Sequence, residues 1–395
     1  MRRVDVIIAG GGPSGLSTGL HLLQRNPEWK HRVVLLEKAR YPRPKLCGGG
    51  LTWYGEQVLR ELGLDVEELP HVPLEELKTL LGEKSVSFYG KPVGRVVRRD
   101  EFDAWLAGKA QAAGLEVHTG EAITNVTAHE GGVTVETASE RYEARALVVA
   151  DGSKGGLRRM LGIEEPARVA RLIEILTPAK DEPSNRLHDE RRAIFDFECA
   201  PQGLQGYYWD FPCVVGGERR VNRGVYDARI ASNMPKADLK KMLRASLEAR
   251  GLDMDQVELM GHPIRWFHPK ATVSLPHVLL VGDAAGVDPL MGEGISFALA
   301  YGKVAAATLE NAFAREDLRF QDYRQALLRS RFGRSLVQRA AWASLIYRLP
   351  YAWVTRLVFA ALRLGIRVMP AMRTYAPGSK AGPAPGWGLW REKRR

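Results

Sequence analysis

The chain has 395 residues and a net charge of +11, with 45% of its residues apolar and 26% charged. This composition excludes a disordered chain and a fibrous repeat, and the length predicts about two or three domains. Residues 319–395 carry 16 Lys and Arg against 2 Asp and Glu, whereas the first 318 residues carry 41 against 44, so most of the chain is nearly neutral and unlike a nucleic-acid-binding protein.

Cysteine content and apolar runs bear on where the protein works. Cys47, Cys199 and Cys213 are too few and too scattered for a disulfide framework or for a metal site with recognisable ligand spacing. A reducing compartment is therefore expected. The N-terminal apolar run is too short for a signal peptide, and no run of about 18 apolar residues is present. We predict a cytoplasmic protein with no metal site and no spanning helix.

The first segments of the chain predict a dinucleotide-binding unit. Residues 4–9 form an aliphatic run typical of a buried strand, and apolar residues in 16–23 have helical spacing. A second strand at 32–36 precedes Glu37 and Lys38, where a carboxylate can accept hydrogen bonds from ribose hydroxyls. This motif alone does not separate NAD from FAD, and a glycine-rich loop without a ligand is the alternative. The G-x-G-x-x-G motif between the first strand and helix, suited to a pyrophosphate, comprises Gly10, Gly12, Pro13, Ser14 and Gly15.

Three later segments resemble flavoproteins built on the aromatic-hydroxylase plan. Residues 99–106 are similar to the family segment R-x-x-F-D-x-x-L, which implies that Arg99 lies near FAD. Residues 147–152 resemble the strand that ends in the family's aspartate, here Asp151. Residues 278–286 resemble the strand that delivers Gly282 and Asp283, and the resemblance implies that Asp283 holds the ribityl chain. Because all three segments occur in family order, they indicate FAD. A capped amphipathic helix is the alternative for residues 99–106.

Three more segments resemble the geranylgeranyl reductases of that superfamily. Residues 42–51 look like the K-x-C-G-G-G signature, which implies cofactor contacts for Cys47, Gly48 and Gly49. Residues 287–295 resemble the turn P-x-x-G-E-G-I, which here comprises Pro289, Gly292, Glu293, Gly294 and Ile295. Residues 207–212 are similar to the strand Y-x-W-x-F-P that lines an isoprenoid channel, with Tyr207, Trp209, Phe211 and Pro212 as lining residues. The alternatives are a small buried cysteine and ordinary core aromatics.

One segment departs from this family pattern. The expected G-x-G after the aromatic strand is replaced by Gly224, Val225 and Tyr226, so Tyr226 adds bulk to the expected channel lining. The departure concerns the geometry on the substrate side more than the flavin side.

The resemblance implies an FAD-dependent reductase that hydrogenates isolated C=C bonds in a prenyl chain of a lipid, a quinone or a tetrapyrrole. Its reduced flavin would supply hydride to CH–CH groups. No second G-x-G-x-x-G in a strand-helix setting follows residue 50, so electrons are expected from NADPH, from ferredoxin or from another electron-donor protein. The alternatives are a flavin monooxygenase or halogenase on the same scaffold, and a membrane-associated flavoprotein that carries electrons. The predicted catalytic residues are Cys47, Tyr207, Trp209, Gly292, Glu293 and Gly294.

The expected fold is α/β, with a Rossmann-type FAD-binding domain and an inserted mixed α+β substrate domain whose sheet lines the active site. The FAD-binding domain is assigned to residues 1–75, 95–165 and 270–320, and the substrate domain to 76–94 and 166–269.

A C-terminal helical region is expected at 321–376. It combines aromatic and aliphatic residues with arginines at helical spacing, among them Arg356, Arg363 and Arg367, as in helices that lie in a membrane surface. The alternative is a helix packed on the domain with its arginines in water. Residues 377–395, rich in Gly and Pro, predict a flexible basic tail. Peripheral attachment to the inner face of the membrane is therefore expected.

Overall fold

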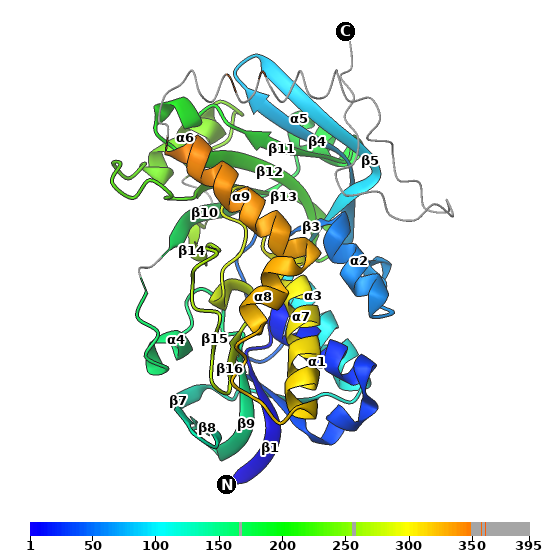
Figure 1. Cartoon of the computed structure of the whole chain (residues 1–395). Coiled ribbons are helices and arrows are strands. Elements are labelled where there is room, and N and C mark those ends of the chain that lie inside the picture. Colours follow the sequence, from blue (N-terminus) through cyan, green and yellow to red (C-terminus); the bar gives the residue numbers. More distant parts are fainter. Residues whose placement is uncertain (166–167, 255–257, 349–356, 358–359, 361–395) are drawn as a thin grey trace, which may run out of the picture.

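The computed structural model describes residues 1–165, 168–254, 258–348, 357 and 360. Its elements form two eight-stranded sheets with helices packed around them (Figure 1). The predicted α/β fold with a Rossmann-like flavin-binding unit is confirmed.

The first sheet has a parallel core of the order β16-β9-β1-β2-β6. Residues Val6 to Ala9 and the whole second strand are buried, as expected for strands covered on both faces. Helix α1 (Pro13–Arg25), which follows β1, packs against helix α7 (Ile295–Ala314), which comes after β16. Both helices lie on this sheet (Figure 1). The strands of this sheet are β1 (Arg2–Ala9), β2 (Val33–Glu37), β6 (Glu116–Thr119), β7 (Ile123–His129), β8 (Gly132–Thr137), β9 (Arg141–Val149), β15 (Ser274–Leu275) and β16 (Val278–Leu280).

The second sheet is antiparallel except where β11 pairs with β4, and its order is β14-β10-β13-β12-β11-β4-β5-β3. Its strands are β3 (Gly50–Thr52), β4 (His71–Leu81), β5 (Lys84–Val97), β10 (Val169–Pro178), β11 (Arg192–Asp196), β12 (Gly206–Val215), β13 (Glu218–Asp227) and β14 (Met260–Arg265). Successive side chains of β12 point to opposite faces of the sheet. Tyr207, Trp209 and Phe211 belong to the hydrophobic core on one face, whereas Tyr208 packs on the other face against residues of α6 (Leu239–Glu248).

The second sheet extends beyond the residues assigned to it from sequence. β4 already begins at His71 and β5 continues to Val97, because the two strands pair along nearly their whole length. The expected boundaries at 76 and 94 therefore fall inside strands.

The described helices connect and cover the two sheets. They are α1 (Pro13–Arg25), α2 (Trp53–Glu61), α3 (Arg99–Ala112), α4 (Leu157–Met160), α5 (Glu182–Asp189), α6 (Leu239–Glu248), α7 (Ile295–Ala314), α8 (Tyr323–Arg329) and α9 (Arg331–Tyr347). α9 crosses in front of the second sheet (Figure 1), with Phe332 and Leu336 in the core of the first sheet and Ala343 and Tyr347 in that of the second.

The C-terminal helical region thus begins as a helix packed on the body of the protein. The stripe of Arg356, Arg363 and Arg367 and the tail at 377–395 lie outside the described residues. Within the described residues, no helix combines the length and apolarity that crossing a bilayer requires.

Candidate flavin and substrate site

One cavity of about 1900 Å³ joins the glycine motif of the first sheet to the aromatic face of the second. Its volume exceeds the roughly 300–1,000 Å³ of a pocket for one small molecule. It therefore has room for a dinucleotide and a second ligand. The predicted site residues that line it are Gly10, Gly12, Pro13, Ser14, Glu37, Lys38, Cys47, Gly48, Gly49, Arg99, Asp151, Tyr207, Trp209, Phe211, Tyr226, Asp283, Gly292, Glu293, Gly294 and Ile295.

Four predicted residues do not line the cavity. Gly15 and Gly282 pack against Gly10 and Ser14 respectively and so shape the wall from behind. Pro289 accepts a hydrogen bond from Tyr226 behind the turn. Pro212 was expected to line the substrate channel, and this prediction is wrong. Strand alternation turns it away from the face that carries Trp209 and Phe211.

The glycine motif has the geometry that a pyrophosphate needs. Gly10 has a φ of +118°, and a Cβ there would collide with the carbonyl of Ala150. A Cβ on Gly12 would meet only the Arg43 side chain, at 3.9 Å, so the backbone at Gly12 faces open space. The N-terminus of α1 begins beside this space at Pro13, where free N–H groups favour an anion.

Glu37 is buried and held at the end of β2. Its Oε2 accepts a hydrogen bond from Gly11 N at 2.8 Å, and its Oε1 accepts one from Ala39 N at 2.9 Å. Arg43 lies 3.5 Å from Glu37 and 3.1 Å from Asp103, so this arginine joins the glycine motif to α3. The carboxylate keeps lone pairs for ribose hydroxyls at a fixed position.

The predicted arginine on α3 is held by a neighbouring carboxylate. Arg99 donates two hydrogen bonds of 2.8 Å to Asp103, and both side chains are buried. Burial alone would lower the pKa of Arg99, but Asp103 raises it, so the guanidinium stays charged at the cavity wall. Burial raises the pKa of Asp283 while Lys45 and Arg99 oppose that effect.

Asp151 offers an acceptor that the described residues leave unused. Its Oδ2 accepts a hydrogen bond from Leu157 N at 3.0 Å, whereas its Oδ1 is buried and has no hydrogen-bond partner in the described part of the chain. Together with the space at Gly12 and the held carboxylate of Glu37, this set of donors and acceptors fits FAD.

The loop with Cys47 lies between the flavin motifs and the aromatic strand. Gly49 N donates to Cys47 Sγ at 3.4 Å, and Cys47 N donates to Glu174 Oε1 at 3.2 Å. A Cβ on Gly48 would be 3.1 Å from the Phe211 ring and 3.4 Å from Trp209 Nε1. Burial raises the pKa of the Cys47 thiol above its ordinary value of 9.0, so Cys47 carries its proton at neutral pH.

The aromatic strand packs tightly against the Cys47 loop and the neighbouring strand. Trp209 Nε1 donates to Asn222 Oδ1 at 2.7 Å, and its ring covers Gly224, which has no side chain to displace it. Phe195 packs against both Tyr207 and Phe211, with ring centroids 5.2 and 5.1 Å apart. These rings form an aromatic chamber beside the loop.

The turn at Pro289–Gly294 is held from the second sheet. Tyr207 donates its hydroxyl hydrogen to Met291 O, and Tyr226 donates to Pro289 O at 3.2 Å. Gly292 has a φ of +68°, and a Cβ there would be 3.0 Å from the Tyr226 ring. The bulk expected of Tyr226 therefore supports this turn.

The carboxylate of Glu293 is bound by other side chains of the protein. It lies 3.0 Å from Arg339 Nη2 and accepts a hydrogen bond of 2.7 Å from Thr52 Oγ1. Arg339 also pairs with the buried Asp288 at 2.6 Å. These contacts place Glu293 as a residue that fixes the entry to α7, where Gly294 is the N-cap.

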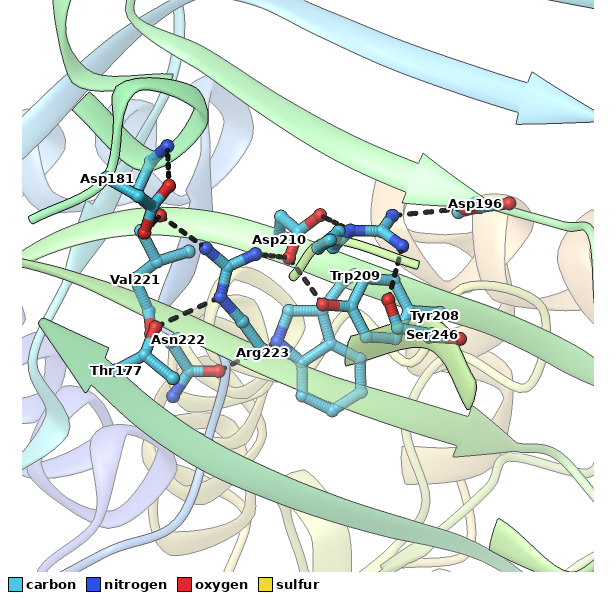
Figure 2. Close-up of polar contacts among 12 residues, drawn as sticks. Thr177, Asp181, Asp196, Tyr208, Trp209, Asp210, Val221, Asn222, Arg223 and Ser246 are labelled. Atoms are coloured by element: carbon cyan, nitrogen blue, oxygen red, sulfur yellow. Dashed lines mark hydrogen bonds and ion pairs between the residues drawn. The ribbon is translucent and has the colours of Figure 1, made fainter. Parts of the chain in front are cut away.

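A polar network lies on the outer face of β12 and β13, behind the chamber (Figure 2). Asp210 accepts hydrogen bonds from Tyr208 at 2.6 Å, from Arg250 at 2.8 Å and from Arg223. Arg223 donates in turn to Thr177 at 3.0 Å. The network anchors β12 on the face opposite Trp209.

Sequence reasoning missed several residues at the site. Glu174, 1% exposed, supports the Cys47 loop, and Arg339 supports the turn. His262 Nε2 accepts a hydrogen bond from Lys45 Nζ at 2.5 Å. Burial and the neighbouring Lys45 lower the pKa of His262 to about 3, so it stays neutral and able to accept. Glu174, His262 and Arg339 occur alone in the sequence, outside any motif.

The fold, the glycine cradle and the held carboxylates define a dinucleotide-binding flavoprotein. The chain belongs to the FAD binding domain family, whose model matches residues 3–302. Membership in this family of FAD-dependent oxidoreductases confirms the predicted cofactor.

The relatives agree with the resemblance to geranylgeranyl reductases. The chain is 29% identical over 329 residues to digeranylgeranylglycerophospholipid reductase 2 of Methanopyrus kandleri, covering 79% of this chain and 78% of the relative. It is also 29% identical over 328 residues to menaquinone reductase of Mycolicibacterium smegmatis, covering 77% and 76%. The resemblance is confirmed at the level of the family, and the substrate differs between these two relatives.

Solved structures share the fold. A geranylgeranyl bacteriochlorophyll reductase-like protein from Thermoplasma acidophilum has a TM-score of 0.70 at 21% identity, covering 89% of this chain and 92% of that one. A halogenase has a TM-score of 0.69 at 16% identity, covering 93% and 82%. Since reductase and halogenase scaffolds fit equally well, the fold does not choose between the chemistries.

Proposed function

We propose that this chain is an FAD-dependent reductase that hydrogenates isolated C=C bonds in a prenyl chain. The observation that carries the proposal is the single cavity in which the dinucleotide cradle continues into an aromatic chamber, with the Cys47 loop between them. The chamber suits an apolar chain, and the relatives named as reductases of geranylgeranyl lipids and of menaquinone act on molecules that carry such chains.

FAD would be held by the backbone at Gly12, by Glu37 and by Asp283, with Arg99 at the wall. When bound and reduced, it supplies hydride. NADPH or ferredoxin is the proposed source of its electrons, because the chain has no second nucleotide motif in a strand-helix setting.

The chain itself supplies a proton and a surface for developing charge. An isolated alkene has no carbonyl to accept electron density, so a proton must add to one carbon as hydride adds to the other. The Cys47 thiol, which lines the cavity between the cradle and the chamber and stays protonated at neutral pH, is the proposed donor, and solvent would return a proton to its thiolate. Positive charge on the more substituted carbon would be stabilised by about 0.5–2 kcal/mol over the face of an aromatic ring such as Trp209.

We also propose a peripheral position on the inner face of the membrane. Trp342 and Leu345 on α9 are 55% and 52% exposed, as in residues that enter a lipid surface. Such contact would bring the cavity opening close to a lipid substrate.

The test is anaerobic incubation of the dithionite-reduced holoenzyme with geranylgeranyl lipids, prenyl diphosphates and menaquinone. We expect products that are heavier by two hydrogens for each reduced bond. A product that gains one oxygen, with oxygen consumed under air, would overturn the proposal in favour of a monooxygenase. Absence of any product from the chemically reduced protein would indicate a flavoprotein that only carries electrons.

A further inference from the structure

The cavity opens at the surface along one stripe of α9. Arg331, Arg334, Gln338 and Trp342 line the cavity and are also exposed, which places them at an opening. Their spacing of three, four and four residues puts them on one side of the helix. The other lining residues that are exposed, Lys38, Pro44, Ala122, Lys154 and Met160, belong to the flavin side. The α9 stripe therefore borders a separate opening.

This opening leads into the aromatic chamber. Ala343 and Tyr347, on the buried side of α9, pack in the same core as Tyr207 and Trp209. Leu290, whose carbonyl accepts a hydrogen bond of 2.8 Å from Tyr347, also lines the cavity. A chain lying in the chamber can therefore leave it along the stripe, whose N-terminal end carries Arg331 and Arg334.

The charge at the opening is positive and meets no neutralising carboxylate within the part of the chain that the structure describes. Arg331 donates a long hydrogen bond of 3.4 Å to Gln57 and stacks over Trp53 and Tyr54. Arg334 donates to the carbonyl of Arg329. Among the described residues neither has a carboxylate partner, in contrast to Arg339 on the same helix.

The carboxylates of the cavity lie elsewhere. Those that line it are Glu37, Glu121, Asp151, Asp283 and Glu293. The first four belong to the flavin side, and Glu293 is paired with Arg339. Among the described lining residues, an anion at the α9 opening therefore meets the two cations Arg331 and Arg334, and the one carboxylate on that side, Glu293, is already paired with Arg339.

We propose that Arg331 and Arg334 bind the phosphate of the substrate's head group, so that this chain acts on a phosphate-bearing prenyl lipid in preference to a quinone. Guanidinium groups pair with phosphate through two hydrogen bonds, and the N-terminus of α9 adds positive potential at Arg331. The apolar chamber takes the prenyl chain. The assignment rests on the proposed function for the reaction, but head-group binding is measured without turnover.

The experiment measures dissociation constants of the holoenzyme for three probes in neutral detergent micelles. The probes are geranylgeranyl diphosphate, a digeranylgeranyl glycerophospholipid and menaquinone. The test variant is Arg331→Gln with Arg334→Gln, and the matched control is Arg348→Gln, which removes an exposed charge just after α9 that does not line the cavity.

We expect the double variant to weaken binding of the phosphate probes by about 100-fold, since each lost charged hydrogen-bonding group costs about tenfold. Menaquinone binding stays within about twofold, as for an uncharged head group. The two phosphate probes distinguish a diphosphate from a phospholipid head group. The probe that matches the substrate should bind more tightly and should lose more affinity in the double variant. The variant Arg331→Lys with Arg334→Lys keeps both charges but loses the paired hydrogen bonds of the guanidinium groups, so we expect it to recover only part of the affinity.

Equal weakening of all three probes, or no weakening, would overturn the assignment. A second arm uses anionic vesicles that contain no prenyl lipid. If the double variant loses vesicle binding while its micellar constants stay unchanged, the arginines contact the membrane and the head-group site is wrong.

Failure of the proposed function has a different signature. If no probe is reduced but the phosphate probes still depend on the arginines, the reductase proposal fails and the phosphate site stands. If a probe is reduced but the arginine variant binds the phosphate probes as tightly as the wild type, the reductase proposal stands and the phosphate site is wrong. Flavin content and thermal unfolding of each variant establish that it is folded.

Discussion

The substitution Asp210→Asn tests the network behind the aromatic chamber. Asp210 is 1% exposed and faces Arg223, whose side chain is 3% exposed and whose other partners, Thr177 and Ser184, are neutral hydroxyls. Asparagine keeps the shape but leaves that guanidinium buried without a directly paired carboxylate among the described residues, since Asp181 reaches it only through Ser184. Removing one partner of such a pair costs about 3–5 kcal/mol.

Arg250 adds less to this cost. It keeps Asp196 at 3.1 Å and is 20% exposed, so solvent screens part of the loss. The assay is urea unfolding of the holoenzyme at neutral pH, with Glu182→Gln as the control. Glu182 pairs with Arg186 at the surface, where both are more than half exposed, and its loss costs about 0.5 kcal/mol or less.

If Asp210→Asn lowered the free energy of unfolding by as little as the control does, Arg223 would not depend on Asp210 as its buried counter-charge. The double variant Asp210→Asn with Arg223→Met provides a second check, because it removes the stranded charge and should recover part of the stability. Since Trp209 lies on the opposite face of the same strand, we also expect a rise in KM for the prenyl substrate in the single variant.

Four further variants test the site itself. Gly12→Ala folds, since its Cβ has open space, but does not retain flavin; retention at wild-type absorbance would contradict the cradle. Cys47→Ala keeps flavin and lowers kcat about 100-fold as a lost proton donor, whereas full turnover would remove that role. Burial raises the pKa of Glu174 above 4.5, so between pH 4.5 and the folded pKa the folded state holds a proton that the unfolded state has lost, and stability falls as pH rises. Glu174→Gln has no proton to lose, so its stability should fall less than that of the wild type over this pH range. A difference in stability that does not change with pH would contradict this. Gly224→Ala places a methyl group against the Trp209 ring and against the carbonyl oxygen of Ile173 on the neighbouring strand, so both should shift and KM should rise while flavin content stays unchanged; an unchanged KM would count against Trp209 as a chamber wall.

Local patterns in the chain identified residues of the flavin side that line one cavity in the structure. The strand, the glycine motif and the acidic residue at Glu37 are close in sequence, and their backbone geometry follows from residue type. Glu174 was not predictable in this way, because it supports Cys47 from 127 residues away. A single glutamate in a strand is normally solvent-facing, whereas here the Cys47 loop lies on the face of β10 that carries Glu174. Pro212 was misplaced because a motif that names consecutive residues ignores strand alternation.

The arginines of α9 have different surroundings. Arg339 is turned inward, where it neutralises Asp288, which is fully buried, and Glu293 at the entry to α7. Helical spacing then directs Arg331 and Arg334 to the cavity opening, five or more residues earlier on the same helix. Arginines on the exposed side of α9 thus border an opening between solvent and an apolar chamber. Because α9 packs on both sheets, a change that loosens it should affect the turn at Gly292 and the opening together.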